Sequence, residues 1–110
     1  MKSADEVVVV LCTVGRREDA EGIAAAIVER GLAACANILP GIVSVYRWRG
    51  ELQKDEEWLL VVKTLRERFE DLRAAIVALH PYEVPEVVAL PVAAGHPPYL
   101  SWVAANSSRS

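Results

Sequence analysis

The stretch from Leu32 to Gly50 decides the fold of this chain, and it reads LAACANILPGIVSVYRWRG. After Gly41 the side chains alternate between two faces with the period of a β-strand. One face carries Ile42, Ser44, Tyr46 and Trp48. Fully extended, the stretch would span ~60 Å, whereas a domain of this size has a radius of gyration of ~13 Å, so part of it must bend or project. Pro40-Gly41 is the expected break, because proline cannot donate to a strand ladder and glycine accepts the backbone angles of a bulge.

The composition predicts one folded domain over residues 1–110, with disordered tails at 1–6 and 106–110. Hydrophobic residues make up 53% of the chain, which is enough for a core without disulfides. The net charge is −3 and the basic residues are scattered, so we expect no nucleic-acid partner. No apolar run approaches the ~20 residues of a membrane span. Two acids precede the first apolar run, unlike a secretory signal, so we expect a cytoplasmic protein without membrane contact.

The first half of the chain predicts a strand, a helix and the long strand described above. Val7–Thr13 is a continuous apolar run, as in a strand covered on both faces. Apolar residues then recur with helical spacing over about 18–30, and Gly31 suits the position just after the helix. Gly50–Asp55 is polar and is expected to form a turn.

The second half predicts a strand, a helix, a strand and a terminal helix. Glu56–Lys63 is apolar on both faces and is expected inside the sheet. Thr64 and Glu67 have the spacing of a capping box, and the helix they begin is expected to end at His80-Pro81. Val84–Val92 contains two prolines, which favour an outer strand. A short helix or turn is expected from Tyr99 to Val103.

This order, β-α-β-β-α-β, is typical of the ferredoxin-like α+β folds. It predicts an antiparallel sheet of strand order 4-1-3-2, with both helices on one face and a short C-terminal helix after the last strand. The long aromatic strand then lies at a sheet edge. Natural proteins seldom leave such an edge bare, and pairing with further copies of the chain is the simplest cover.

The chain resembles the CutA1 family of divalent-cation tolerance proteins over residues 7–104. The resemblance lies in the order and spacing of several short motifs: Ala33-Ala34-Cys35-Ala36-Asn37-Ile38, Pro40, Ser44, Tyr46, Trp48, Gly50, Glu57, Lys63-Thr64, His80-Pro81-Tyr82, Pro85-Glu86, Tyr99 and Trp102. It implies a homotrimer similar in architecture to the PII signalling proteins, in which long hairpins build the contacts between subunits. It also implies a role in tolerance of copper and other divalent metals, with no established enzyme activity.

Cys12 and His80 are the candidate metal ligands. In the expected topology the first strand and the second helix end at the same edge, so these two side chains can meet, and thiolate with imidazole suits copper or zinc. The resemblance implies copper ligands at the same two positions. Where some family members carry a second histidine, this chain has Leu79, so the site is expected to be weak and to take a third donor from Glu83, solvent or another subunit. The alternative is a buried core thiol and a histidine that bonds the last carbonyls of its helix.

Cys35 is expected at the opposite end of the sheet from Cys12. Two strand spacings plus several residues of rise put the thiols more than ~7 Å apart, so they should not form a disulfide within one subunit. We read Cys35 as a small core residue, and His96 as a solvated residue of a proline-rich loop.

Tyr46, Trp48 and Trp58 are predicted to pack at the trimer interface, since aromatic side chains anchor such contacts. Alternatively, they line a cleft between subunits that binds a small ligand. The chain has none of the phosphate-loop, zinc-hydrolase or serine-hydrolase motifs, and the phosphate loop of acylphosphatases, which share the topology, is also missing. The sequence therefore predicts a metal-binding trimer without enzyme activity, or else a PII-like regulatory trimer that acts on an unknown protein partner.

Overall fold

The structure is a computed structural model that describes residues 6–107. Its elements are β1 (Val7–Val14), α1 (Arg17–Glu29), β2 (Cys35–Trp48), β3 (Glu51–Leu65), the 3-10 helix η2 (Arg66–Arg68), α2 (Phe69–Leu79), β4 (Val88–Pro91) and α3 (Pro97–Asn106). The predicted tails lie mostly outside the described residues, although Asn106 ends α3 and Ser107 is buried. No helix within the described part of the chain is long and apolar enough to cross a membrane.

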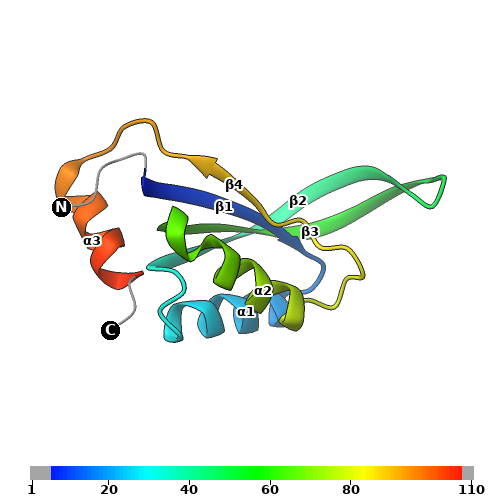
Figure 1. The fold of residues 1–110 in the computed structure, drawn as a ribbon. Helices are drawn as coiled ribbons and strands as arrows, with labels where there is room; N and C mark the ends of the chain where they lie inside the picture. Colours follow the sequence, from blue (N-terminus) through cyan, green and yellow to red (C-terminus); the bar gives the residue numbers. More distant parts are fainter. Residues whose placement is uncertain (1–5, 108–110) are drawn as a thin grey trace.

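The four strands form one antiparallel sheet in the order β2-β3-β1-β4, and α1 and α2 cover one of its faces (Figure 1). This confirms the predicted α+β architecture and strand order. Alternate residues of β1 are buried against the two helices, namely Val8, Val10, Cys12 and Val14. On the other face of the sheet, α3 covers only the end at Val7 and Leu65, and Val88 and Leu90 of β4 are exposed beside Leu11 and Val9 of β1.

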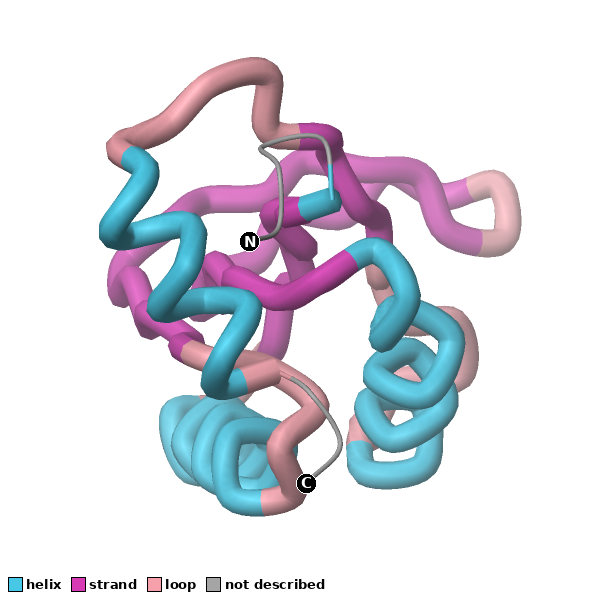
Figure 2. The backbone as a smooth tube through the Cα atoms, turned by 60° about the vertical axis from the view of Figure 1, so that its left-hand side comes forward, coloured by secondary structure: helices cyan, strands magenta, loops and turns pink. Residues whose placement is uncertain are grey.

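A smaller second core joins α3 to the end of the sheet. Leu100 and Val103 of α3 pack against Val7 of β1 and Leu65 of β3. Figures 1 and 2 show α3 at this end of the sheet, opposite the tip of the β2–β3 hairpin. The C-terminal helix is longer than predicted, because Pro97 and Pro98 occupy its first turn, where the missing N–H groups cost nothing.

The hairpin is longer than predicted, and its turn is shorter. Residues 51–55 were expected to form a polar turn, but they belong to β3, and only Arg49 and Gly50 connect the strands. These two residues have φ angles of 53° and 81°, which is the left-handed pattern of the tight turns that match the twist of a hairpin. The ribbon projects from the body of the molecule (Figure 1), whose extents are 47 × 25 × 22 Å.

The expected break at Pro40-Gly41 is a β-bulge. The register of β2 against β3 shifts between Leu39 and Ile42, and Gly41 has a φ of 74°. The extra residue exchanges the two faces of the strand. Before the bulge, Ile38 faces α1 and α2 opposite Leu60, whereas beyond it the even-numbered residues of β2 lie on the opposite face, with Glu57.

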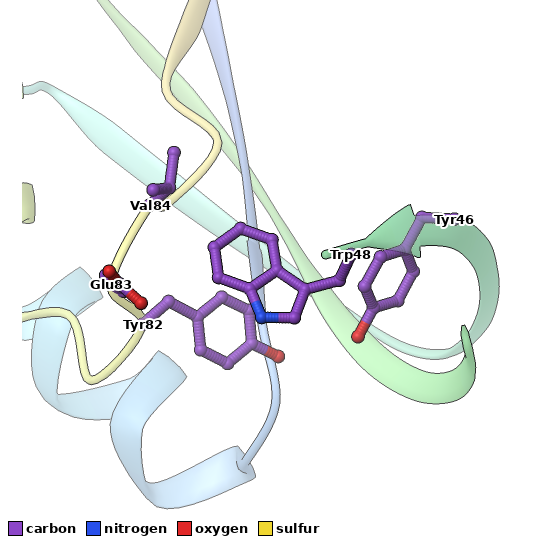
Figure 3. A pocket seen from close by; sticks show the side chains of 5 residues that line it. All are labelled: Tyr46, Trp48, Tyr82, Glu83 and Val84. Atoms are coloured by element: carbon purple, nitrogen blue, oxygen red, sulfur yellow. The ribbon is translucent and has the colours of Figure 1, made fainter. Parts of the chain in front are cut away.

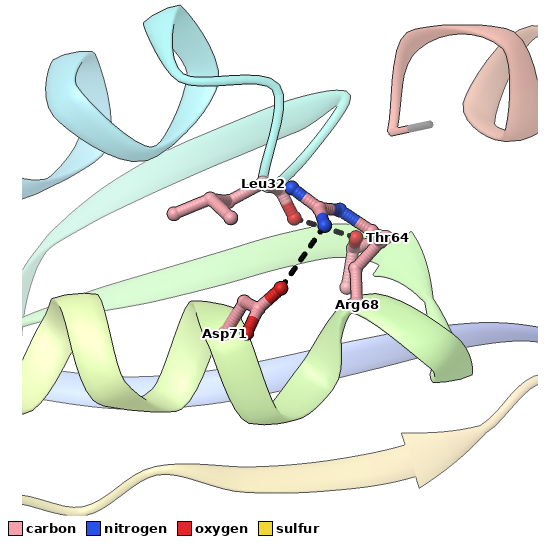
Figure 4. A network of polar contacts seen from close by, with 4 residues as sticks. All are labelled: Leu32, Thr64, Arg68 and Asp71. Carbon is pink, nitrogen blue, oxygen red and sulfur yellow. Dashed lines mark hydrogen bonds and ion pairs between the residues drawn. The ribbon is translucent and has the colours of Figure 1, made fainter. Parts of the chain in front are cut away.

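Two local predictions are wrong. Thr64 does not cap a helix; it lies in β3, and its hydroxyl donates a 2.7 Å hydrogen bond to the carbonyl of Leu32 (Figure 4). The last strand spans only Val88–Pro91 rather than Val84–Val92, and the residues before it form a loop. That loop carries part of the candidate site.

Candidate functional site

His80 is the first residue after α2, and its ring is tied to β1 and to its own loop. Its Nε2 donates a 2.8 Å hydrogen bond to the carbonyl of Thr13, which can only accept. Its Nδ1 accepts a 3.1 Å hydrogen bond from the backbone N–H of Tyr82. Both ring nitrogens therefore have partners, and the arrangement requires a neutral imidazole with its proton on Nε2.

Cys12 lies beside Thr13 in β1, but its side chain points into the core between the sheet and the helices. It is fully buried. Burial raises the pKa of its thiol from 9.0 to about 12, and the negative charges of Glu86 and Glu57 act in the same direction. The structure thus brings His80 to the backbone next to Cys12, as the topology predicts, while it disfavours the thiolate that binds metals.

The other candidate donors are engaged elsewhere. Glu83 forms a 2.7 Å ion pair with Arg49 at the hairpin turn. Cys35 lies at the start of β2 and contacts Asn37, and both cysteines are free, as expected. Within residues 6–107 there is no group of three or more His, Cys, Asp or Glu side chains that is placed to hold a metal ion.

Tyr82 and Glu57 form a hydrogen bond that joins the loop after α2 to β3. The phenol of Tyr82 donates a 2.6 Å hydrogen bond to the carboxylate of Glu57, a residue that is only 5% exposed. Burial, and then the bond to Glu57, raise the pKa of Tyr82 above its usual range. Gly15 leaves room for the phenol, because a Cβ at that position would lie 2.7 Å from its oxygen.

A pocket of about 260 Å³ lies between the hairpin and the loop after α2. It is lined by Tyr46, Trp48, Tyr82, Glu83 and Val84. Figure 3 shows the three aromatic side chains gathered around it, two from β2 and one from the loop. An adjoining hollow shares Tyr46 and Val84 with this pocket and reaches the carboxylates of Glu57 and Glu86. The phenol of Tyr46 donates to Asp55 of β3, which raises the pKa of Tyr46.

Arg49 lies at the rim of this pocket. Its guanidinium is 5.3 Å from the centre of the Trp48 ring and also pairs with Glu83. The backbone of Arg49 has a positive φ, which is uncommon for a residue with a side chain. The hairpin turn thus places a cation on an aromatic ring at the mouth of the pocket.

The structure separates the three residues predicted for the trimer interface. Tyr46 and Trp48 line the pocket, whereas Trp58 is half-buried against the chain's own core. The roles of Tyr82 and Glu57 were not identified from sequence beyond their presence in the family motifs. The only local signal was the Pro-Tyr pair after the second helix, which marks a loop that is held in place.

The fold and pocket define a ferredoxin-like α+β domain with an aromatic and acidic cleft at the base of a projecting hairpin. The family described as CutA1 divalent ion tolerance protein matches residues 8–106, and the chain belongs to this family.

Three relatives illustrate the match. The divalent-cation tolerance protein CutA of Thermus thermophilus is 54% identical over 90% of this chain and 96% of its own length, and its solved structure matches with a TM-score of 0.90, covering 93% of this chain and 99% of that one. A structure described as the periplasmic divalent cation tolerance protein CutA of Archaeoglobus fulgidus is 33% identical, with a TM-score of 0.89 and coverages of 93% and 99%. The chloroplastic CutA of Arabidopsis thaliana is 48% identical over 94% of this chain, which spans only 56% of that protein.

Proposed function

We propose that this protein acts in the tolerance of divalent cations, with copper or another divalent metal as the ion concerned. The observation that carries the proposal is the match of nearly the whole chain to a family, and to relatives, that are named for this role. Growth of a deletion strain in graded copper, with and without the gene restored, tests it. Equal growth of the two strains at every concentration would contradict the proposal.

We propose that Cys12 and His80 bind the metal ion, as a weak site whose formation costs free energy. His80 would have to give up one of its two hydrogen bonds, and Cys12 would have to lose a proton that burial retains. Binding would therefore release a proton and strengthen as the pH rises. Copper titration should show weaker binding in Cys12→Ala and His80→Ala than in the matched control Cys35→Ala. If all three bind copper like the parent protein, the site is wrong.

We further propose that the protein is cytoplasmic, has no enzyme activity and acts as a homotrimer. The support for the trimer is the exposed apolar surface of the hairpin, where Val43, Val45 and Leu52 are 56%, 61% and 70% exposed, since surface of this kind marks an interface. Light scattering should give three chains, and Trp48→Lys should lower that number or the stability. A monomer at micromolar concentration would contradict the trimer, and an unchanged trimer in the variant would place Trp48 outside the contact.

A second candidate is a PII-like regulatory trimer that binds a small ligand beside the hairpin and acts on a protein partner. The aromatic pocket favours it, because ligand sites are typically concave and apolar with a few convergent polar groups. Thermal-shift screening of nucleotides, amino acids, amines and small anions tests this candidate. A screen without any stabilising compound would count against it.

A further inference from the structure

We propose that the pocket lined by Tyr46, Trp48, Tyr82 and Glu83 binds an organic cation, of the quaternary or alkylated ammonium class. The inference rests on the second candidate function, the binding of a small ligand, and names the chemical class of that ligand. Three features carry it: the aromatic lining, the surrounding carboxylates, and the position of the chain's own cation.

The aromatic lining has the composition that suits a cation. Three of the five lining residues are Tyr46, Trp48 and Tyr82, and a cation over the face of such a ring is attracted by its negative quadrupole. The phenols of Tyr46 and Tyr82 each donate their proton to a carboxylate. Such donation shifts electron density toward the rings, so both become better partners for a positive charge.

The charges around the pocket point the same way. Glu83 lies in its wall, Asp55 and Glu57 accept from the tyrosines, and Glu86 lies in the adjoining hollow with Glu57. The positive group placed against this pocket is Arg49. Four carboxylates against one guanidinium favour a cation and disfavour the phosphates and carboxylates that an arginine-rich cleft would select. A bare metal ion is a poorer fit, because the described residues offer no cluster of three donors.

The contacts of Arg49 illustrate the preference of this pocket for a cation. Its guanidinium already contacts both the Trp48 ring and the Glu83 carboxylate, at 5.3 Å from the ring centre and 2.7 Å from the oxygen. The turn holds Arg49 in a left-handed backbone conformation that asparagine or glycine would adopt more readily. The two-residue turn requires a positive φ at this position, and the residue that the chain has there is a cation. An external ammonium group would use the same ring and carboxylate, and Arg49 is therefore its competitor.

Choline and its neutral analogue 3,3-dimethylbutan-1-ol test the inference, because they share a shape and differ in charge. We expect choline to bind in the millimolar range by calorimetry, and the neutral analogue to bind at least about fivefold more weakly. Arg49→Ala should tighten choline binding, whereas Arg17→Ala, which removes another exposed arginine paired with a glutamate, should leave it unchanged. In the Arg49→Ala protein, adding Glu83→Gln should weaken choline and leave the neutral analogue unaffected.

Tryptophan fluorescence identifies the ring. Trp48→Phe should weaken choline binding and remove the fluorescence change that choline causes, and the matched control Trp102→Phe, an exposed tryptophan of α3, should keep both. Equal affinity for choline and the neutral alcohol would overturn the cation site while leaving a small-ligand pocket standing. Absence of choline binding in both the parent protein and Arg49→Ala would also overturn it. If the wider screen then finds a ligand of another class, the second candidate function survives without this inference.

Discussion

The phenol of Tyr82 donates a 2.6 Å hydrogen bond to the carboxylate of Glu57, and this contact holds the loop after α2 against β3. The same loop is held against β1 by the ring of His80, which packs 4.6 Å from the Tyr82 ring, centre to centre. Two neighbouring side chains of one loop thus contact two different strands. The aromatic pocket has a defined wall because this loop is fixed.

Tyr82→Phe should lower the free energy of unfolding by about 1–3 kcal/mol, because a buried carboxylate then loses its donor. Urea unfolding measures the change, and Tyr99→Phe, at an exposed tyrosine of α3, is the control. In the double variant with Glu57→Gln the two effects should not add, since both remove the same contact. Additive effects would mean that the phenol and the carboxylate contribute independently.

Cys12 predicts a specific loss of stability at alkaline pH. Its pKa is raised from 9.0 to about 12 in the folded protein, so the folded state keeps a proton that the unfolded state releases. The resulting stabilisation of the folded state is complete below pH 9.0. It is lost as the pH rises from 9.0 toward about 12, by about 1.4 kcal/mol per pH unit. The stability difference between the parent protein and Cys12→Ala should therefore shrink above pH 9, measured by urea unfolding. Cys35→Ala should follow the parent curve, and a constant difference for Cys12→Ala up to pH 10.5 would contradict the prediction.

Thr64→Val should cost about 1–3 kcal/mol, although the two side chains have nearly the same shape, because the buried carbonyl of Leu32 loses its donor. The loop between α1 and β2 is fastened to β3 at this point. Thr13→Val, at a half-buried threonine of the same sheet, provides the comparison and should change stability by less than about 0.5 kcal/mol. Equal losses in the two variants would mean that the hydroxyl of Thr64 has no special role.

Gly41→Ala and Gly22→Ala should act in opposite directions. Gly41 has a φ of 74° at the bulge, and an alanine there should cost about 1–2 kcal/mol. Gly22 lies within α1, where an added Cβ meets nothing within 4 Å, so alanine should stabilise by about 0.5–1 kcal/mol. Thermal unfolding of both variants checks the pair, and a stabilised Gly41→Ala protein would contradict the strained turn of the bulge.

Periodicity in the sequence was sufficient for the order of the elements, and the ferredoxin-like pattern of that order predicted the sheet order and the side on which α1 and α2 lie. In β1, β3 and α1, the spacing of the apolar residues allows only one type of element and one placement that buries those residues. The prediction from sequence was wrong for exposed segments, because a segment that is not buried has no alternation of apolar and polar residues to indicate its structure. Residues 51–55 are polar apart from Leu52, because they lie in a ribbon that projects into solvent, and a mostly polar segment next to a glycine has the same sequence pattern as a turn.

The details of the site were beyond sequence reasoning because they depend on backbone atoms and on distant partners. His80 was expected near Cys12, yet its hydrogen-bond partner is the carbonyl of Thr13. Every residue has a backbone carbonyl, so the sequence does not indicate which carbonyl a side chain contacts. Thr64 has the residue type and spacing of a helix cap, but the register of β3 against β1 places it opposite Val8 inside the sheet. There its hydroxyl finds a carbonyl from another part of the chain.

The single inserted residue at Pro40-Gly41 sets which way the cleft opens. Because the bulge adds one residue to β2 and none to β3, Tyr46 and Trp48 lie on the face opposite Ile38, although all three have even numbers. A regular ladder through both Pro40 and Gly41 would put the two aromatic side chains on the helix side and would present Val43 and Val45 to the loop instead. Deleting one of the two residues would remove the bulge and leave Tyr46 and Trp48 on their present face, so the number of residues in this segment, rather than its bend, sets the orientation of the binding surface.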